Sequence, residues 1–161
     1  MNKFRNARQS DALRCFEIET AAYEGDEAAT LNKISKRIEV YPDGFLILEE
    51  QGEIVGFINC GCAHEVEMSD EEFKELVGHD ADAPNVVIMS VVVDPAHQGT
   101  GLSRALMTEF VDRMRSMGKS AIYLICKEHH VPLYQRLGYS YLHPSTSGHG
   151  GMTWHEMSMQ L

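Results

Sequence analysis

The segment that most constrains the fold is a β-branched run followed by a glycine-rich turn and an amphipathic stretch. Residues 91–93 are all valine, the run stops at Asp94, and Gly99 and Gly101 lie in the turn that follows. Apolar residues then recur at helical spacing across residues 102–117. This order predicts a strand, a tight loop and a helix. The unpaired N–H groups and the dipole at the start of such a helix favour a bound phosphate group.

The spacing within this turn excludes two common nucleotide-binding motifs. A dinucleotide-binding fold requires G-x-G-x-x-G and a P-loop requires G-x-x-x-x-G-K-[ST], and the turn matches neither. Gln98, Gly101 and Ser103 instead give the pattern Q-x-x-G-x-S. This pattern resembles the pyrophosphate-binding loop Q/R-x-x-G-x-G/A of the Gcn5-related N-acetyltransferase (GNAT) superfamily. A glycine turn with a purely structural role is the alternative interpretation.

The length and charge of the chain limit its class and its partners. A chain of 161 residues fits a single domain covering residues 1–161. Its formal net charge of −10 disfavours nucleic acid and anionic membranes and favours cations such as protonated amines. The sequence shows no signal peptide and no apolar run of about 18 residues, so we expect a soluble, cytoplasmic protein.

The four cysteines do not form a metal-binding pattern. Cys15, Cys60, Cys62 and Cys126 lie in apolar surroundings and include no C-x-x-C pair. We therefore expect them to be small core residues, and we expect no metal site.

The order of strands and helices predicts a mixed α/β domain. A helix crosses between the apolar runs 85–93 and 121–126, so these two strands should be parallel. On the second helix we expect Arg37 to point outward with Lys33 and Lys36. Strands are expected at 3–7, 45–50, 53–64, 85–93, 121–126, 139–142 and 153–159, and helices at 10–23, 27–40, 69–77, 102–117 and 131–137.

A second motif makes the resemblance more specific. Residues 131–139 read VPLYQRLGY, which is similar to the C-terminal signature of the arylalkylamine (serotonin) N-acetyltransferase branch of the GNAT superfamily. Residues 153–157, TWHEM, also resemble that branch. The likeness covers nearly the whole chain.

The resemblance implies a fold and a co-substrate. The fold would be α/β (α+β), with a mixed, splayed seven-stranded sheet flanked by about four to five helices. Acetyl-coenzyme A would lie in the cleft between strands 85–93 and 121–126, with its pantetheine arm paired to strand backbone. The cofactor-binding residues that the resemblance implies are Val91, Val92, Val93, Gln98, Gly99, Thr100, Gly101, Leu102, Ser103, Arg104 and Tyr134.

The resemblance also implies a reaction by direct attack. A neutral amine would attack the thioester, and Tyr134 would protonate the departing thiolate as general acid. The alternative for Tyr134 is a packing role at a helix start. The branch has two histidines on its central strand, and those positions here are Val87 and Met89. We expect His64, Ser90 or a water chain to remove the amine proton instead, with the pair His129 and His130 as weaker candidates.

The expected function is acetyl transfer to a small primary amine. Tyr23, Glu24 and Met89 are the candidate acceptor-binding residues, with His64 and the loop 145–151 nearby. The acid-rich segment 65–84 is either a solvated surface insert or a rim that attracts a cationic substrate. The alternatives are an acyl-coenzyme A sensor without turnover and a protein or peptide N-acetyltransferase. We expect a monomer or a homodimer.

Overall fold

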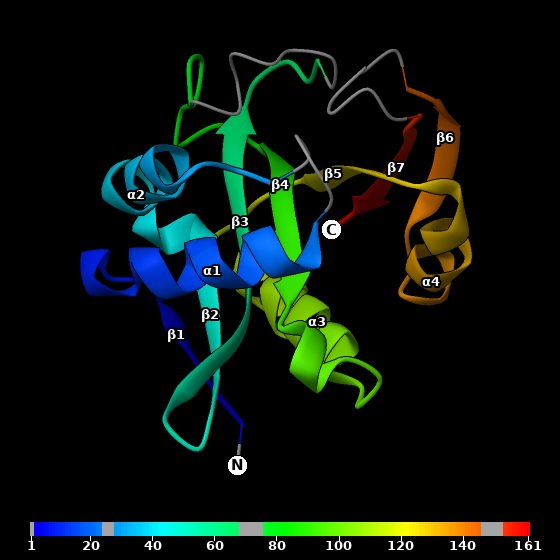
Figure 1. Ribbon diagram of the computed structural model, residues 1–161. Helices are drawn as coiled ribbons and strands as arrows, with labels where there is room; N and C mark the ends of the chain where they lie inside the picture. The colour runs from blue at the N-terminus through cyan, green and yellow to red at the C-terminus, as the bar shows by residue number, and fades with distance from the viewer. Residues whose placement is uncertain (1, 24–27, 68–75, 146–152) are drawn as a thin grey trace.

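The chain forms a seven-stranded sheet with helices on both faces (Figure 1). The computed structural model describes residues 2–23, 28–67, 76–145 and 153–161. The strands are β1 (Asn2–Asn6), β2 (Phe45–Glu50), β3 (Glu53–Ala63), β4 (Asn85–Val93), β5 (Ala121–Cys126), β6 (Ser140–Pro144) and β7 (His155–Gln160). The main helices are α1 (Ala12–Ala22), α2 (Leu31–Val40), α3 (Leu102–Ser116) and α4 (Val131–Arg136).

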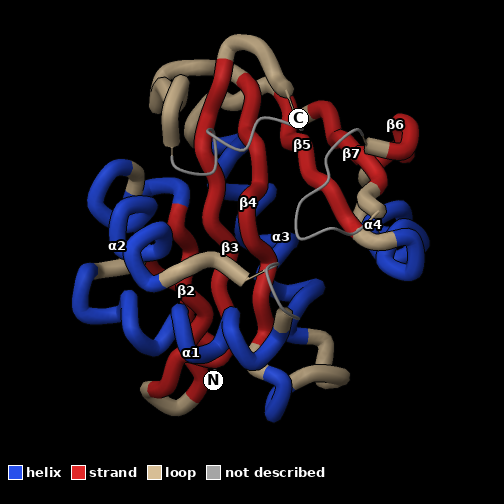
Figure 2. The backbone as a smooth tube through the Cα atoms, turned by 45° about the horizontal axis from the view of Figure 1, so that its top comes forward, coloured by secondary structure: helices blue, strands red, loops and turns tan. Residues whose placement is uncertain are grey.

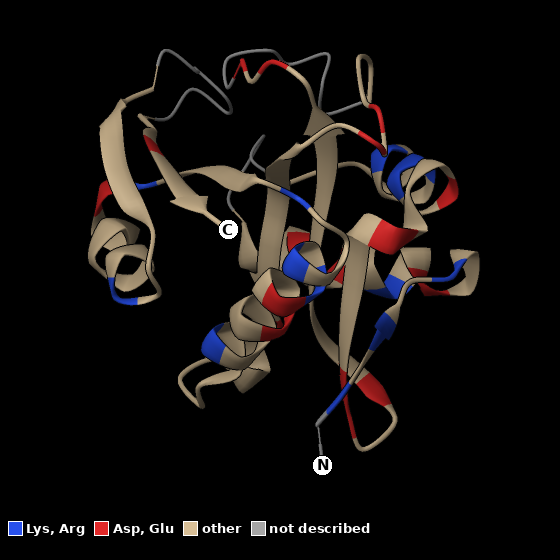
Figure 3. Ribbon diagram, turned by 180° about the vertical axis from the view of Figure 1, so that it is seen from behind, with Lys and Arg blue, Asp and Glu red and all other residues tan. Residues whose placement is uncertain are grey.

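Two apolar clusters hold the layers together, one on each face of the sheet. The cluster under α1 and α2 includes Cys15, Ile18 and Ile34. The cluster under α3 includes Leu106 and Phe110, and side chains of α4 pack against it. Helix α1 lies in front of the sheet in Figure 1, and α3 lies in front in the reverse view of Figure 3. Strands β2, β3 and β4 are therefore buried on both faces over most of their length, whereas the edge strand β6 is exposed.

The sheet opens between its two central strands. The strand order is β1-β2-β3-β4-β5-β7-β6, and β4 pairs with β5 in parallel only at residues 85–87. Beyond Val87, β4 continues beside β3, whereas β5 continues beside β7 as far as the pair Cys126 and His155. Figure 2 shows the two halves of the sheet diverging from this point. The splayed, mixed seven-stranded sheet that the family resemblance implied is confirmed.

A bulge marks the middle of β4. The β3–β4 register shifts between Asn59 and Cys60, which face Ser90 and Ile88. Met89 therefore has no partner position on β3. A bulge of this kind bends a strand and increases its local twist, so it contributes to the divergence of β4 from β5.

The predicted elements are found with small changes at their ends. The parallel pairing of β4 with β5 is confirmed. Helix α2 begins at Leu31 rather than at 27, because the Thr30 side chain caps it by accepting from the Lys33 N–H at 3.2 Å. The helix predicted at 69–77 falls largely outside the described residues.

The predicted orientation of Arg37 is wrong. Arg37 is 4% exposed and lies between Ile34 and Ile38 on the inward stripe of α2. Its Nη1 atom is 3.4 Å from Asn59 Oδ1 and 3.5 Å from Ser90 Oγ. The helical spacing of position 37 relative to the two isoleucines decides its direction, and the charge does not.

The cysteines are buried and reduced, as expected for core residues. Within the described ranges, no three or more His, Cys, Asp or Glu side chains are grouped so that they could hold a metal ion. No helix among the described residues is long and apolar enough to cross a membrane.

Candidate functional site

A cavity of about 540 Å³ occupies the opening between β4 and β5. The end of β4 and the start of α3 form one wall, and the end of β5 with the turn to α4 forms the other. Ala22 and Tyr23, at the end of α1, and Trp154, just before β7, complete the lining. The lining residues on the two walls are Val91, Val92, Val93, Gln98, Ser103 and Met107, and Ile125, Cys126, Lys127, His129, His130, Leu133, Tyr134 and Leu137.

The backbone of β4 turns alternate peptide groups into this cavity. The Asp94 N–H donates to the Val55 carbonyl at 2.8 Å. Because hydrogen-bonded positions alternate along an antiparallel pair, Val91 and Val93 direct their backbone groups away from β3 and toward the opening. The Val91 carbonyl accepts from the Tyr23 hydroxyl at 3.0 Å, and the Val93 carbonyl accepts from Gln98 Nε2 at 3.2 Å. Their N–H groups face the same side and can pair with an extended ligand.

The turn before α3 is shaped for an anion. Gly99 and Gly101 have φ values of +83° and +82°, which favour glycine. Gly101 is the N-cap of α3 and has no side chain to cover the N–H groups of the first turn. Asp94 fixes the base of the turn by accepting from the Ala96 N–H at 3.1 Å and pairing with Arg14 at 2.8 Å. The exposed N–H groups and the helix dipole together favour a phosphate group here.

Tyr134 lies on the opposite wall in its protonated form. Burial raises its pKa, and the nearby Cys126 thiol raises it further. The Tyr134 ring meets the Tyr139 ring edge-on, with centroids 5.8 Å apart. A phenol held neutral in a cavity can donate a proton to a leaving group.

The Cys126 thiol on the same wall is a poor nucleophile. Burial raises its pKa to about 11, and its Sγ atom lies 3.7 Å from Met157 Sδ. At neutral pH the thiol therefore stays protonated.

Two histidines stand at the turn into α4. The rings of His129 and His130 are 4.0 Å apart. Partial burial of the ring lowers the pKa of His130, and the neighbouring His129 and Lys127 lower it further. A neutral imidazole on the cavity wall can accept a proton near neutral pH.

The structure separates some of the residues that the sequence grouped together. His64 follows β3, where its Nε2 atom is 2.9 Å from Asp80 Oδ2 in an exposed pair, and it does not line the cavity. Ser90 is 5% exposed and lies beside Arg37 instead. Met89 lies at the bulge and Glu24 lies outside the described residues. Of the residues expected to bind the cofactor, Val91, Val92, Val93, Gln98, Ser103 and Tyr134 line the cavity, whereas Gly99, Thr100, Gly101, Leu102 and Arg104 belong to the adjoining turn and first helical turn.

Several lining residues were not candidates from the sequence. Met107, Ile125 and Leu133 belong to elements that were placed correctly, and Lys127 directly follows β5, but their side-chain directions depend on the opening of the sheet. Trp154 is 30 or so positions away from β5 along the chain and meets the cavity because β7 pairs with β5. In the sequence, only the position of Trp154 within the motif 153–157 indicated that it could lie near the site.

The fold and the cavity define a class of protein, namely a domain whose sheet opens between two central strands beside a turn suited to an anion. A profile of the Acetyltransferase (GNAT) family matches residues 9–139. The chain therefore belongs to the GNAT family of acetyltransferases.

Curated relatives match parts of the chain. Mycothiol acetyltransferase of Thermobispora bispora is 32% identical over 102 residues, which is 62% of this chain and 30% of that protein. The chloroplastic serotonin N-acetyltransferase 2 of Oryza sativa subsp. japonica is 41% identical over 56 residues, or 35% of this chain and 28% of that protein. The chain thus covers about a third or less of the length of these relatives.

Solved structures match the whole fold. The putative acetyltransferase yncA of Salmonella typhimurium, determined with its cofactor acetyl-CoA, has a TM-score of 0.73 and 25% identity, covering 100% of this chain and 94% of that one. The loading GNATL domain of CurA from Lyngbya majuscula has a TM-score of 0.89 at 16% identity, covering 99% and 98%. The second likeness concerns the fold alone.

Proposed function

We propose that the protein is an N-acetyltransferase that transfers the acetyl group of acetyl-coenzyme A to a small primary amine by direct attack in a ternary complex. The observation that carries the proposal is the cavity between β4 and β5, which has backbone donors and an uncapped helix start on one side and Tyr134 on the other. Family membership and the acetyl-CoA complex of the yncA relative support it.

The described residues fit acetyl-coenzyme A. The pantetheine arm is extended and carries amides, which suit the backbone groups of Val91 and Val93. The pyrophosphate suits the N–H groups of residues 98–103, and Arg104 adds positive charge at the first turn of α3. A side chain at Gly99 or Gly101 would meet nothing within 4 Å, so the space above the turn is open to a ligand.

The reaction needs no covalent enzyme intermediate. The amine nitrogen forms a bond to the thioester carbonyl carbon, and the carbon–sulfur bond then breaks. Tyr134 donates its proton to the departing thiolate, because its raised pKa keeps it protonated at neutral pH. Of the described groups that line the cavity, His130 is an imidazole whose lowered pKa favours the neutral form, which can accept the amine proton. His64 and Ser90 do not line the cavity, so neither is placed to accept this proton directly.

The acceptor is proposed only at the level of a small primary amine. The match to the rice serotonin N-acetyltransferase favours an arylalkylamine. The matches to a mycothiol acetyltransferase and to a glucosamine 6-phosphate N-acetyltransferase of Trypanosoma brucei brucei favour other small amines equally. The net charge of −10 favours an acceptor that arrives as a cation.

A coenzyme A release assay over a panel of amines tests the proposal. Arylalkylamines, polyamines, amino acids and amino sugars are each incubated with acetyl-coenzyme A, and the released thiol is measured. Release above the amine-free rate with at least one acceptor is expected. Binding of acetyl-coenzyme A without release of free coenzyme A in any mixture would favour the alternative, an acyl-coenzyme A sensor without turnover. The observation that favours a sensor is that positions 87 and 89 are Val87 and Met89 rather than histidines.

A further inference from the structure

Tyr23 crosses the open edge of β4 at one end of the acetyl-coenzyme A cavity. It is the C-cap residue of α1, and its side chain packs against the apolar cluster under α1 and α2. Its hydroxyl donates to the Val91 carbonyl at 3.0 Å. Among the described residues, Val91 is the lining residue of β4 that lies farthest from the turn at 98–103. Tyr23 therefore marks the end of the cavity that is opposite this turn.

Both backbone carbonyls that β4 directs into the cavity accept a side-chain donor. The Val93 carbonyl accepts from Gln98 Nε2 at 3.2 Å, as the Val91 carbonyl does from Tyr23. The N–H groups of Val91 and Val93 face the same opening. This edge of β4 therefore offers donors to a ligand, and it suits a ligand that presents carbonyl oxygens to it. The acyl thioester of a coenzyme A derivative carries such an oxygen.

The proposed binding mode decides which part of the ligand meets Tyr23. With the pyrophosphate at residues 98–103, the pantetheine arm runs along β4 from Val93 toward Val91. The thioester is at the far end of this arm, so its carbonyl oxygen comes to the Val91 N–H, with Tyr134 on the opposite wall. The carbon chain of the acyl group then extends beyond Val91, where Tyr23 lies.

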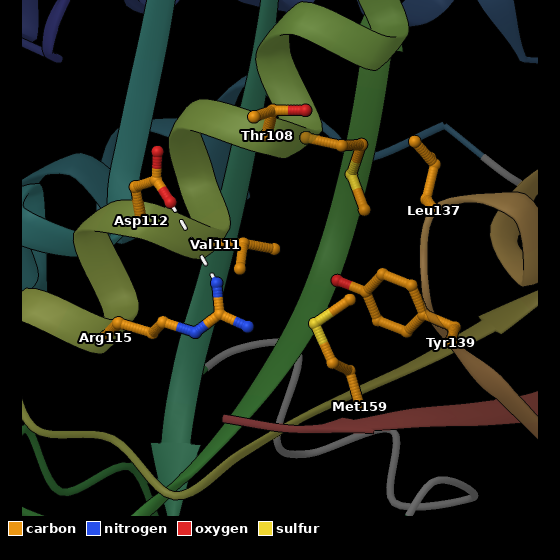
Figure 4. Close-up of a pocket in the computed structure, with 8 residues that line it drawn as sticks. Thr108, Val111, Asp112, Arg115, Leu137, Tyr139 and Met159 are labelled. Atoms are coloured by element: carbon orange, nitrogen blue, oxygen red, sulfur yellow. Dashed lines mark ion pairs between the residues drawn. The ribbon is translucent and has the colours of Figure 1, made fainter.

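A second, smaller cavity is separated from the acyl end of the ligand by packed side chains. It lies between α3 and Met159 on the α3 face of the sheet (Figure 4). Met107 and Leu137 line both cavities, and Met107 is 1% exposed within the apolar cluster under α3. An acyl chain would have to displace these side chains to extend in that direction. The space beside Tyr23 is therefore the place where the length of the acyl chain matters.

We propose that Tyr23 determines which acyl group the protein accepts. Its ring, held in place by the bond from its hydroxyl to the Val91 carbonyl, forms an end wall that admits an acetyl group and disfavours a longer chain such as butyryl. The inference rests on the proposed acetyl transfer and adds acyl selectivity to it.

Calorimetric titration of the intact protein with coenzyme A, acetyl-coenzyme A and butyryl-coenzyme A tests the proposal without an acceptor amine. Coenzyme A has no acyl group, so its affinity reports on the pantetheine arm and the pyrophosphate alone. In the wild type, butyryl-coenzyme A should bind about tenfold more weakly than acetyl-coenzyme A, because its two extra methylene groups press on the Tyr23 ring. The ratio of these two affinities is the selectivity.

Two substitutions of Tyr23 separate the ring from its hydroxyl. Tyr23→Ala removes the wall, so the two acyl derivatives should bind within about threefold of each other. Tyr23→Phe keeps the ring and its packing but loses the bond to Val91, so the selectivity should fall by about two- to threefold. The selectivity is taken within each variant, so a general loss of affinity for the coenzyme cancels. Tyr141→Ala is the control, because Tyr141 is 40% exposed on β6 and does not line the cavity, and it should keep the wild-type selectivity.

Three results would overturn the proposal. Equal affinities for acetyl- and butyryl-coenzyme A in the wild type would show that no wall limits the acyl chain, while the coenzyme site itself would stand. A wild-type selectivity that persists in Tyr23→Ala and Tyr23→Phe would place its origin elsewhere, and Tyr23→Phe alone decides if Tyr23→Ala does not fold. Failure of all three ligands to bind the wild type would remove the proposed function, and this inference with it.

Discussion

At the scale of single residues, polar side chains lie in two separate places, one beneath α2 and one in the cavity between β4 and β5. Arg37, Asn59 and Ser90 form a polar group beneath α2, on the face of the sheet that α1 and α2 cover. Tyr134 and Cys126 lie in the cavity on the other side of the opening. Desolvation raises the pKa of Tyr134, whereas Arg37 is buried beside the polar side chains of Asn59 and Ser90.

The first prediction concerns Arg37. Arg37→Ala removes a buried charge and its side-chain volume and leaves Asn59 and Ser90 with fewer partners, so it should lower the free energy of unfolding by about 3 kcal/mol. Urea denaturation measures this change. Lys36→Ala, one position away on the exposed side of α2, should stay within about 0.5 kcal/mol of the wild type. Equal effects of the two substitutions would show that Arg37 is not part of the packed interior.

The second prediction concerns Tyr134. Tyr134→Phe removes the proton donor, so kcat for acetyl transfer should fall about 100-fold while KM for acetyl-coenzyme A changes little. Initial rates of thiol release from about pH 6 to about pH 10, which approaches the pKa of a primary alkylamine, measure the effect. Tyr141→Phe, on β6 outside the cavity, should behave as the wild type. An unchanged rate of Tyr134→Phe at every pH would remove Tyr134 from the mechanism.

At the scale of elements, the order and type of the strands and helices follow from sequence periodicity, whereas the opening of the sheet does not. The β-branched runs, the glycine turn and the crossing helix were enough to place β4, α3 and β5 and to predict their parallel arrangement. The opening depends on where β4–β5 pairing ends, at Val87, and on the bulge at Met89. Neither the end of the β4–β5 pairing nor the bulge can be predicted from the pattern of apolar residues, so the opening of the sheet was expected only from the family resemblance. Arg37 was predicted to face solvent because it is charged, but it is buried. Trp154 reaches the cavity because β7 pairs with β5, which the sequence did not indicate.

The third prediction concerns the turn before α3. Gly101→Ala and Gly52→Ala are matched, because both glycines have φ +82° and neither has an atom within 4 Å of an added Cβ. Each should cost about 1 to 2 kcal/mol of stability from left-handed strain. Only Gly101→Ala should weaken acetyl-coenzyme A binding, by about tenfold or about 1.4 kcal/mol, because Gly52 lies in the β2–β3 hairpin. Thermal unfolding and calorimetric titration measure the two quantities, and equal affinities would argue against the anion-binding turn.

The fourth prediction concerns the attachment of β1 to the start of α1. Arg5 donates to both carboxylate oxygens of Asp11 at 2.7 and 2.9 Å, which holds the Asp11 pKa below its ordinary value of 3.8. Because the folded pKa lies below the unfolded one, this pair stabilises the fold above about pH 4, and the stability is lost as pH falls through the folded pKa.

Denaturation between about pH 2 and 6 tests this linkage. Asp11→Asn should be less stable at pH 6 and should lose less stability than the wild type on acidification. Asp43→Asn, on the exposed turn after α2, is the control and should keep the wild-type slope. A wild-type slope in Asp11→Asn would assign the acid sensitivity to other groups.

At the scale of the whole molecule, an acidic protein is expected to bind an anionic co-substrate. The formal net charge is −10, and acidic and basic positions are interspersed along α3 rather than gathered into a basic patch (Figure 3). The attraction therefore has to come from local backbone dipoles at the turn and the start of α3, with Lys127 and Arg104 nearby. The overall charge would then act on the second substrate, by drawing in a cationic amine.

Equilibrium dialysis of the intact protein against radiolabelled acetyl-coenzyme A tests the central claim most directly. We expect saturable retention of one molecule per chain, displaced by unlabelled coenzyme A and reduced about tenfold in affinity by Gly101→Ala but not by Gly52→Ala. Equal concentrations of labelled acetyl-coenzyme A on the protein side and the buffer side, at every concentration up to about 1 mM, would contradict this expectation.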